Sequence, residues 1–144
     1  MINIFLHVRN FIWDKIVHWL THEKSNGGNQ LSNFERLRYE LKPGDVLLVE
    51  GRSKVADIIK MITQSIWTHS ILYLGRIHEI DDHDLRIRIQ KYYDYGEDDQ
   101  LIIESLLGAG TIVTTLNKYT YDHLRICRPT GLTHVDAQKV IEYA

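Results

Sequence analysis

The stretch of sequence that decides the fold of this chain is THSILYLG, residues 68–75. A short run of apolar and aromatic side chains closed by a glycine is typical of a buried β-strand. His69 opens this predicted strand, so a rigid element would hold its imidazole at the rim of a sheet. A histidine in that position is well placed to act as a base.

A second apolar run, LIIESLL at residues 101–107, contains a single acid, Glu104. Burying a carboxylate is costly unless it is paired, and His69 is the obvious partner. A histidine and an acid on neighbouring strands supply the base and the orienting group of a nucleophile–base–orienter set. The alternative is structural: His69 would be a core histidine bonded to a backbone carbonyl, and Glu104 would merely interrupt a strand.

The rest of the domain predicts an α+β fold. Helices are expected to begin after the natural N-caps Ser53 and Thr133. Strict alternation of apolar residues and arginine at residues 85–89 predicts one arm of an exposed hairpin. Further strands are predicted at residues 45–51, 111–116 and 123–129. In this order the elements indicate a mostly antiparallel sheet packed with helices.

The N-terminal segment, residues 2–22, is predicted to form an amphipathic helix with a wide apolar face and a narrow polar stripe. Such a face must be covered, either by the chain's own domain or by a partner chain, including a second copy of this protein. A helix that contacts a membrane peripherally is the alternative, favoured by Trp13 and Trp19. The predicted organisation is an N-terminal helix (1–24), a linker (25–38) and one domain (39–144).

The composition excludes several classes of protein. A net charge of -2 without a basic patch argues against a nucleic-acid partner. The single cysteine, Cys127, rules out an internal disulfide and a cysteine-rich zinc site, and it fits a reducing compartment such as the cytoplasm. No uncharged apolar run approaches the ~18 residues needed to cross a bilayer. Residues 78–84 are rich in His, Asp and Glu, but they are nearly consecutive and fit a solvated loop better than a metal site.

Four motifs, taken in order and spacing, resemble one family. They are LKPGDVLLVEG (41–51), TQSIWTHS (63–70), IES with GAG (103–105 and 108–110) and RICRP (125–129). The chain from about residue 41 to residue 144 resembles the permuted papain-like amidases of the YaeF/YiiX type. These are circularly permuted relatives of the NlpC-type cell-wall peptidases and of lecithin:retinol acyltransferase. The resemblance implies a permuted papain-like fold.

The resemblance also implies a Cys-His-acid catalytic set, in which the histidine comes first and the cysteine last. His69 matches the family's histidine and Glu104 its acid, whereas the nucleophile would fall beyond Ala144. The chain as given is therefore expected to lack the nucleophile-bearing part and to be inactive. Cys127 is a poor substitute, because it lies within a predicted strand and not at a helix N-terminus that would lower the pKa of its thiol.

Two further residues are candidates for substrate binding. Glu50, just before Gly51, could line the substrate cleft. Trp67 stands two residues before His69 and could form a pocket wall, although a core aromatic is as good a reading. Asp45 is more simply explained as a hydrogen-bond acceptor in a turn than as a chemical group.

The resemblance implies a cysteine-dependent hydrolase or acyltransferase that acts on an amide or ester. His69 would be the base and Glu104 the orienter, with no metal or organic cofactor. The substrate stays open between small molecules, peptide-like amides and lipid acyl groups. Two alternatives belong to other classes: a non-catalytic binding module that keeps His69 and Glu104, and a membrane-surface adaptor that acts through the first helix.

Overall fold

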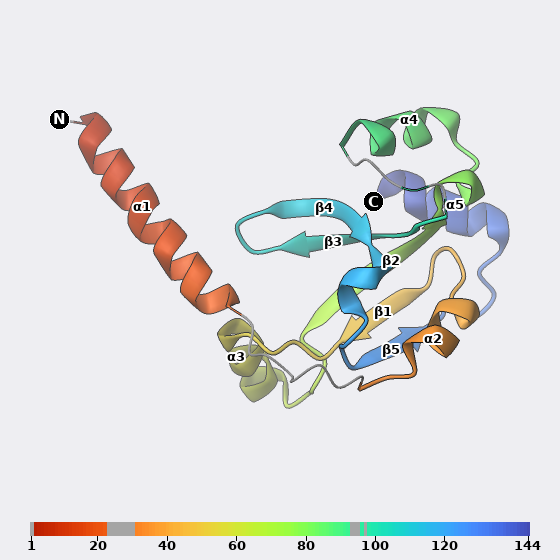
Figure 1. The fold of residues 1–144 in the computed structure, drawn as a ribbon, viewed down its shortest axis with the longest axis horizontal. Helices are drawn as coiled ribbons and strands as arrows, with labels where there is room; N and C mark the ends of the chain where they lie inside the picture. The colour runs from red at the N-terminus through yellow and green to blue at the C-terminus, as the bar shows by residue number, and fades with distance from the viewer. Residues whose placement is uncertain (1, 23–30, 93–95, 97) are drawn as a thin grey trace.

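A five-stranded antiparallel sheet forms the centre of the molecule (Figure 1). The computed structural model describes residues 2–22, 31–92, 96 and 98–144. Within them the strands follow the order β4-β3-β2-β1-β5, and each neighbouring pair is antiparallel. Their bounds are β1 Val46–Val49, β2 His69–Arg76, β3 Gln100–Leu106, β4 Gly110–Thr115 and β5 Leu124–Cys127. The predicted α+β class with an antiparallel sheet is confirmed.

The strand register decides which side chains share a face of the sheet. Val49 of β1 pairs with His69 of β2 on one side and with Leu124 of β5 on the other. Tyr73 pairs with Ile102 of β3. Because side chains alternate along a strand, His69 and Tyr73 point to the same face as Ile102 and Glu104. The two residues of the candidate site therefore lie on one face of the sheet.

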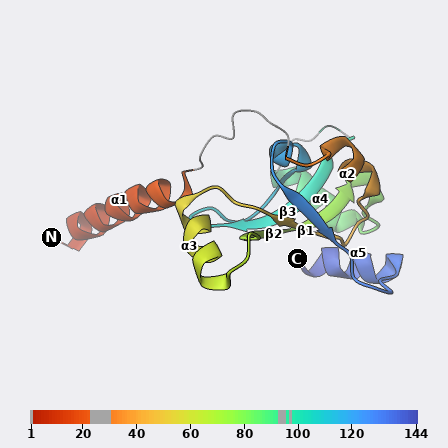
Figure 2. The same cartoon turned by 90° about the horizontal axis from the view of Figure 1, so that it is seen from below.

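Each face of the sheet carries its own layer of helices, and Figure 2 shows α2 and α5 on opposite sides. The His69 face is covered by α2 (Phe34–Glu40) and by the 3-10 turn η2 (Leu116–Tyr119). Its core contains Phe34, Leu37, Leu41, Leu47, Val49, Ile71, Tyr73, Ile102, Leu116, Tyr119 and Leu124. The other face is covered by η1 (Ile77–Glu79), α4 (His83–Tyr92) and α5 (His134–Tyr143). Its core contains Leu74, Ile77, Ile80, Ile89, Leu101 and Ile141.

Helix α2 corrects the predicted linker. Asn33 caps this helix, with its side chain accepting a hydrogen bond from the backbone N–H of Arg36 at 3.1 Å. Phe34 and Leu37 are 1% and 8% exposed, so this segment belongs to the core. The linker predicted over residues 25–38 therefore ends before Asn33, and its residues 25–30 lie outside the described part of the chain. The predicted linker was too long because α2 contains few apolar residues and these lie between charged ones.

Helix α4 replaces the predicted hairpin arm. Asp82 Oδ1 accepts hydrogen bonds from the backbone N–H groups of Asp84 and Leu85, at 2.8 and 3.0 Å, and so starts a helix. Leu85 and Ile89 then face the core at helical spacing, whereas Ile87 is 50% exposed. The alternation at residues 85–89 satisfied a strand pattern and a helix pattern equally, and the cap decided between them.

Two helices stand at one end of the sheet. Helix α1 (Ile2–Thr21) extends away from the domain, and the C-terminal end of α1 contacts α3 (Lys54–Thr63) (Figure 1). Lys54 Nζ lies 3.5 Å from the centroid of the Trp19 ring. Val17 packs so closely on Gly108 that a Cβ at Gly108 would come within 2.9 Å of Val17 Cγ1. Among the described helices, none is long and apolar enough to cross a membrane.

Candidate active site

His69 and Glu104 meet across two neighbouring strands. His69 is the first residue of β2 and Glu104 lies within β3. The distance between His69 Nε2 and Glu104 Oε2 is 2.8 Å. The sequence analysis paired these two residues from the cost of burying a lone acid, and the structure brings them together.

Glu104 is held by two further donors from η2. Lys118 Nζ lies 2.6 Å from Glu104 Oε1, and the Tyr119 hydroxyl donates to Glu104 Oε2. Glu104 itself is 3% exposed. Burial alone would raise the pKa of Glu104, but the hydrogen bonds from His69, Lys118 and Tyr119 outweigh it and lower the pKa to about 2. Glu104 is therefore a carboxylate at neutral pH.

The local sequence explains why η2 reaches Glu104. Strand β4 pairs with β3, so the chain returns along Glu104 before it leaves the sheet at Thr115. Leu116, 1% exposed, then anchors η2 in the core. Lys118 and Tyr119 follow in the same turn and point to the carboxylate. Neither residue could be recognised from the sequence, because only the strand pairing places them beside Glu104.

The carboxylate fixes the role of each imidazole nitrogen. An ionised Glu104 can only accept, so Nε2 of His69 must donate to it. In the neutral imidazole Nδ1 is then the unprotonated nitrogen, which can accept a proton from another group. The side chain of His69 is 25% exposed, so part of the imidazole reaches the surface.

A cavity of about 290 Å³ lies beside His69. Its apolar wall includes Val49, Val55 and Ile59, and its polar wall includes Thr68 and Lys118. The cavity lies between the first turns of α3, the end of β3 and η2, and Thr21 of α1 also lines it. A mixed lining of this kind suits a ligand with an apolar part and a polar part.

A second cavity, of about 360 Å³, lies along β2 and β3. Strand alternation directs Ser70, Leu72 and Ser105 to the face opposite the His69 imidazole. These residues line the cavity together with Thr111 of β4 and Ala144. Ser105 Oγ and Thr111 Oγ1 lie 2.8 Å apart.

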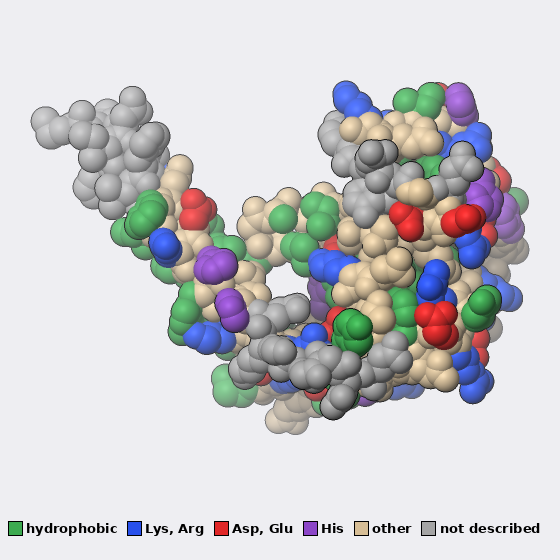
Figure 3. Space-filling model, viewed as in Figure 1, with side chains coloured by type: hydrophobic (Ala, Val, Ile, Leu, Met, Phe, Trp, Pro, Cys, Tyr) green, Lys and Arg blue, Asp and Glu red, His purple; other side chains and the backbone are tan. Residues whose placement is uncertain are grey.

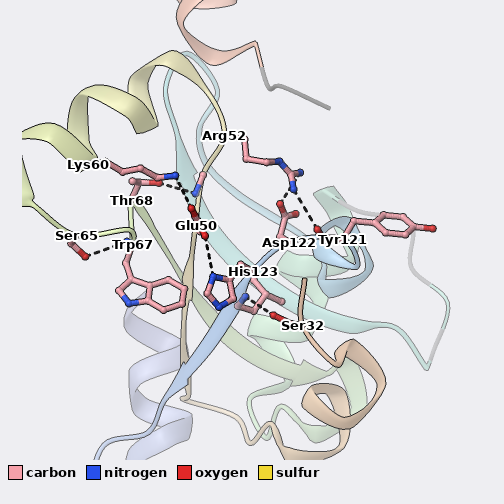
Figure 4. A network of polar contacts seen from close by, with 12 residues as sticks. Ser32, Glu50, Arg52, Lys60, Ser65, Trp67, Thr68, Tyr121, Asp122 and His123 are labelled. Atoms are coloured by element: carbon pink, nitrogen blue, oxygen red, sulfur yellow. Dashed lines mark hydrogen bonds and ion pairs between the residues drawn. The ribbon is translucent and has the colours of Figure 1, made fainter. Parts of the chain in front are cut away.

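The structure groups Glu50 and Trp67 around a residue that the sequence analysis did not single out, His123 (Figure 4). Glu50 Oε2 lies 3.0 Å from His123 Nδ1, and Glu50 Oε1 accepts from Lys60 Nζ at 2.9 Å. The ring centroids of Trp67 and His123 are 4.9 Å apart. Hydrogen bonds from Lys60 and then from His123 lower the pKa of Glu50.

This second histidine–acid pair faces away from the first. Val49 pairs with His69, and Glu50 follows Val49 directly, so its side chain points to the opposite face of the sheet. The backbone N–H of Glu50 donates to the carbonyl of His123 at 3.0 Å, which aligns His123 with Glu50 at the start of β5. The signal for His123 was its position as the first residue of the strand predicted at residues 123–129, since His69 likewise opens a predicted strand.

Cys127 and Asp45 lie in the part of the sheet away from His69. Cys127 pairs with Val46, three residues along β1 from the residue that faces His69, and it lines neither of the two cavities. Asp45 accepts from the backbone N–H of Lys42 at 2.8 Å, as expected for a turn, and from Arg128 Nε at 2.8 Å. Within the described residues, no three His, Cys, Asp or Glu side chains gather closely enough to hold a metal ion.

Comparison of the chain with protein-family models, with curated proteins and with solved structures found no match. The site must therefore be interpreted from its own geometry.

Proposed function

We propose that this chain belongs to a cysteine-dependent amide or ester hydrolase, or acyltransferase, of the permuted papain-like type. His69 acts as the base and Glu104 as the orienter, and a cysteine encoded beyond residue 144 supplies the nucleophile. The observation that carries the proposal is the contact of 2.8 Å between His69 Nε2 and the buried Glu104, which Lys118 and Tyr119 also hold. In the neutral imidazole this arrangement puts the proton on Nε2 and leaves Nδ1 as the acceptor, and 25% of the side chain is exposed.

The geometry is suited to thiol activation. A cysteine thiol brought to His69 Nδ1 would transfer its proton to the imidazole, and the thiolate would attack the carbonyl carbon of the substrate. The imidazolium would then return the proton from Nδ1 to the leaving amine or alcohol, which leaves an acyl-thioester on the cysteine. Water or an acceptor alcohol would release the acyl group. General base catalysis of this kind contributes about 10²–10⁴-fold to a rate.

Glu104 stabilises the imidazolium without taking its proton. Its pKa of about 2 keeps the carboxylate ionised throughout the cycle, so it holds the ring in one tautomer and offsets the positive charge. Lys118 is a positioning residue for His69, because it acts on the imidazole through its hydrogen bond to Glu104.

The two cavities lie on different faces of the sheet. Ala144 lines the 360 Å³ cavity together with Ser70 and Ser105, the neighbours in sequence of His69 and Glu104. The cavity next to His69 would receive the substrate on the opposite face.

The intact mass of the protein from its native source tests the proposal. A chain longer than 16.9 kDa, with a cysteine that opens a downstream helix, is the expected result. In that longer protein, alkylation of the new cysteine should abolish hydrolysis of amide or ester substrates, and His69→Ala should do the same. A native mass of 16.9 kDa would contradict the proposal.

A binding module is the second candidate function. It is favoured by the position of Cys127, the one cysteine of this sequence, which lines neither described cavity. In that case His69, Glu104 and the cavity beside them would hold a ligand without breaking a bond. Thiol labelling separates the two functions, since ligand binding by a module would survive complete alkylation and enzymatic activity would not.

A further inference from the structure

Exposed hydrophobic side chains gather at the end of the molecule formed by α1 and α3. Figure 3 shows them along the side of α1 that points away from the domain. On α1 they include Phe11 (63% exposed), Ile12 (52%), Ile16 (43%) and Trp19 (58%). On α3 the side chains of Met61 and Ile62 are each 73% exposed. Contiguous apolar surface of this kind marks an interaction site.

The apolar face of α1 points outward. Phe11, Ile12, Ile16 and Trp19 share one side of the helix with Lys15 and form a shallow groove there. The residues that meet the domain lie on another side: Val17 packs on Gly108, and Thr21 lines the cavity beside His69. A surface helix normally buries its apolar side against its own protein. Helix α1 does the reverse.

The same surface is basic in an acidic protein. Helices α1 and α3 together carry four bases (Arg9, Lys15, Lys54 and Lys60) and two acids (Asp14 and Asp57), a balance of +2. The whole chain has a net charge of -2, so the rest of the protein carries -4. Since Lys60 is paired with Glu50, the cations available to an outside partner are Arg9, Lys15 and Lys54.

Two of these cations stand over exposed aromatic rings. Lys15 Nζ lies 5.5 Å from the centroid of Phe11, and Lys54 Nζ lies 3.5 Å from that of Trp19. An ammonium beside an aromatic ring combines a group that enters the acyl boundary with a group that meets the headgroups.

We propose that α1, together with the exposed end of α3, docks on the surface of an anionic lipid bilayer. Helix α1, with 20 residues, is about 30 Å long and would lie in the plane of the membrane. Its apolar groove would enter the headgroup–acyl boundary, and Arg9, Lys15 and Lys54 would meet lipid phosphates and carboxylates.

Charge favours this occupant over a second copy of the chain. A two-fold dimer through this surface would bring the lysines of both copies together, and like charges oppose such an interface. An anionic bilayer offers the opposite charge over the whole surface. Docking would also place the cavity beside His69 close to the lipid, because Thr21 of α1 and Val55 and Ile59 of α3 line that cavity. Lipid binding stands whether or not His69 is catalytic.

The test is flotation of the full 144-residue chain with phosphatidylserine-containing vesicles and with phosphatidylcholine vesicles. The unmodified protein should float with the anionic vesicles and more weakly with the zwitterionic ones. The affinity of the variant Phe11→Ser/Ile16→Ser for the anionic vesicles should fall by at least about tenfold, because the variant removes apolar area that would enter the bilayer. Val135→Ser/Val140→Ser is the matched control, since it removes two exposed side chains (62% and 41%) from α5, and its binding should be unchanged.

Lys15→Glu tests the charge separately, because it keeps the four apolar side chains of the groove, Phe11, Ile12, Ile16 and Trp19. It should weaken flotation with the anionic vesicles and leave flotation with the zwitterionic vesicles unchanged, and circular dichroism should show the same helix content in every variant. The proposal is overturned if the unmodified chain does not float or if Phe11→Ser/Ile16→Ser floats as well as it does. A dimer in sedimentation that Phe11→Ser/Ile16→Ser dissociates, without flotation, would assign the surface to a second copy.

Discussion

At the scale of single residues, the environment of Glu104 determines what the site can do. A buried carboxylate normally becomes harder to ionise, but here three donors converge on its two oxygens. The balance favours the charged form, and the charged form in turn directs the proton of His69 to Nε2. The pKa of one acid therefore sets the chemical character of the neighbouring base.

Replacing Glu104 with Gln should remove a pH-dependent part of the stability. The pKa of Glu104 is about 2 in the folded protein against an ordinary value of 4.5. The ionised group therefore stabilises the folded state above pH 4.5, and this contribution is lost as the pH falls through about 2. Urea unfolding should show Glu104→Gln to be less stable by roughly 3 kcal/mol at pH 7, with the difference nearly gone at pH 2.

Glu35→Gln is the control for this titration. The Glu35 side chain is 68% exposed and lies 3.7 Å from Arg38, so its removal should change the free energy of unfolding by no more than about 0.5 kcal/mol at either pH. An equal loss for Glu104→Gln at pH 7 and pH 2 would contradict the role assigned to the ionised carboxylate.

Lys118→Met should raise the pKa of Glu104 toward 4.5, because it removes a hydrogen-bond donor and a positive charge from Oε1. The ¹³C chemical shift of the Glu104 carboxyl carbon, followed from pH 7 to pH 2, measures this pKa directly. Lys60→Met serves as the comparison, since Lys60 pairs with Glu50 and should leave the titration of Glu104 where it is. A pKa that stays near 2 in Lys118→Met would be the contrary result.

At the scale of elements, capping side chains decided the secondary structure of two segments whose hydrophobic pattern was ambiguous. The hydrogen bonds of Asp82 started α4, and the side chain of Asn33 capped α2. Residues 85–89 fit the alternating pattern of a strand, and Leu85 and Ile89 also fit the four-residue spacing of a helix. The choice between them rested on a cap and on which isoleucine met the core.

The two isoleucines of α4 should respond differently to the same change. Ile89 is 6% exposed and Ile87 is 50% exposed. Ile89→Ser should lower the free energy of unfolding by roughly 2–4 kcal/mol, because it leaves a cavity and buries a hydroxyl. Ile87→Ser should change it by no more than about 0.5 kcal/mol. If both variants lost the same free energy of unfolding in urea, the result would contradict the helix and favour a strand, in which both residues share one face.

At the scale of the whole molecule, the sheet domain and α1 contribute differently to stability. Helix α1 meets the domain through α3 and the turn at Gly108, whereas α2 inserts Phe34 and Leu37 into the core. The boundary between an appended segment and the folded domain therefore falls before α2. The charge of the molecule is divided in the same way, with the basic residues of α1 and α3 at one end.

Truncations on either side of this boundary test it. Deletion of residues 1–22 should leave a cooperative thermal transition with a Tm within about 5 °C of the full chain, because few buried contacts are lost. Deletion of residues 1–40 removes Phe34 and Leu37, 1% and 8% exposed, and should abolish the transition. Scanning calorimetry measures both. Loss of the transition in the shorter deletion would make α1 an integral part of the domain.

The sequence by itself determined the five strands of the sheet, the fold class and the pairing of His69 with Glu104, although it also predicted a strand at residues 85–89 where the structure has α4. These features follow from local rules: a strand needs apolar side chains in a row, and a lone acid in such a row needs a partner. Glu50 and Trp67 were candidates for substrate binding only from their positions beside Gly51 and His69, which could not say on which face of the sheet the two side chains would lie.

Only the tertiary structure decided the surroundings of those residues. Strand pairing brought Lys118 and Tyr119 to Glu104, and it placed Glu50 with His123 on the face away from the His69 imidazole. Contacts such as these join residues that lie 14 to 73 positions apart in the chain. Register and alternation set such contacts, because a shift of one residue in pairing would move every side chain of a strand to the other face.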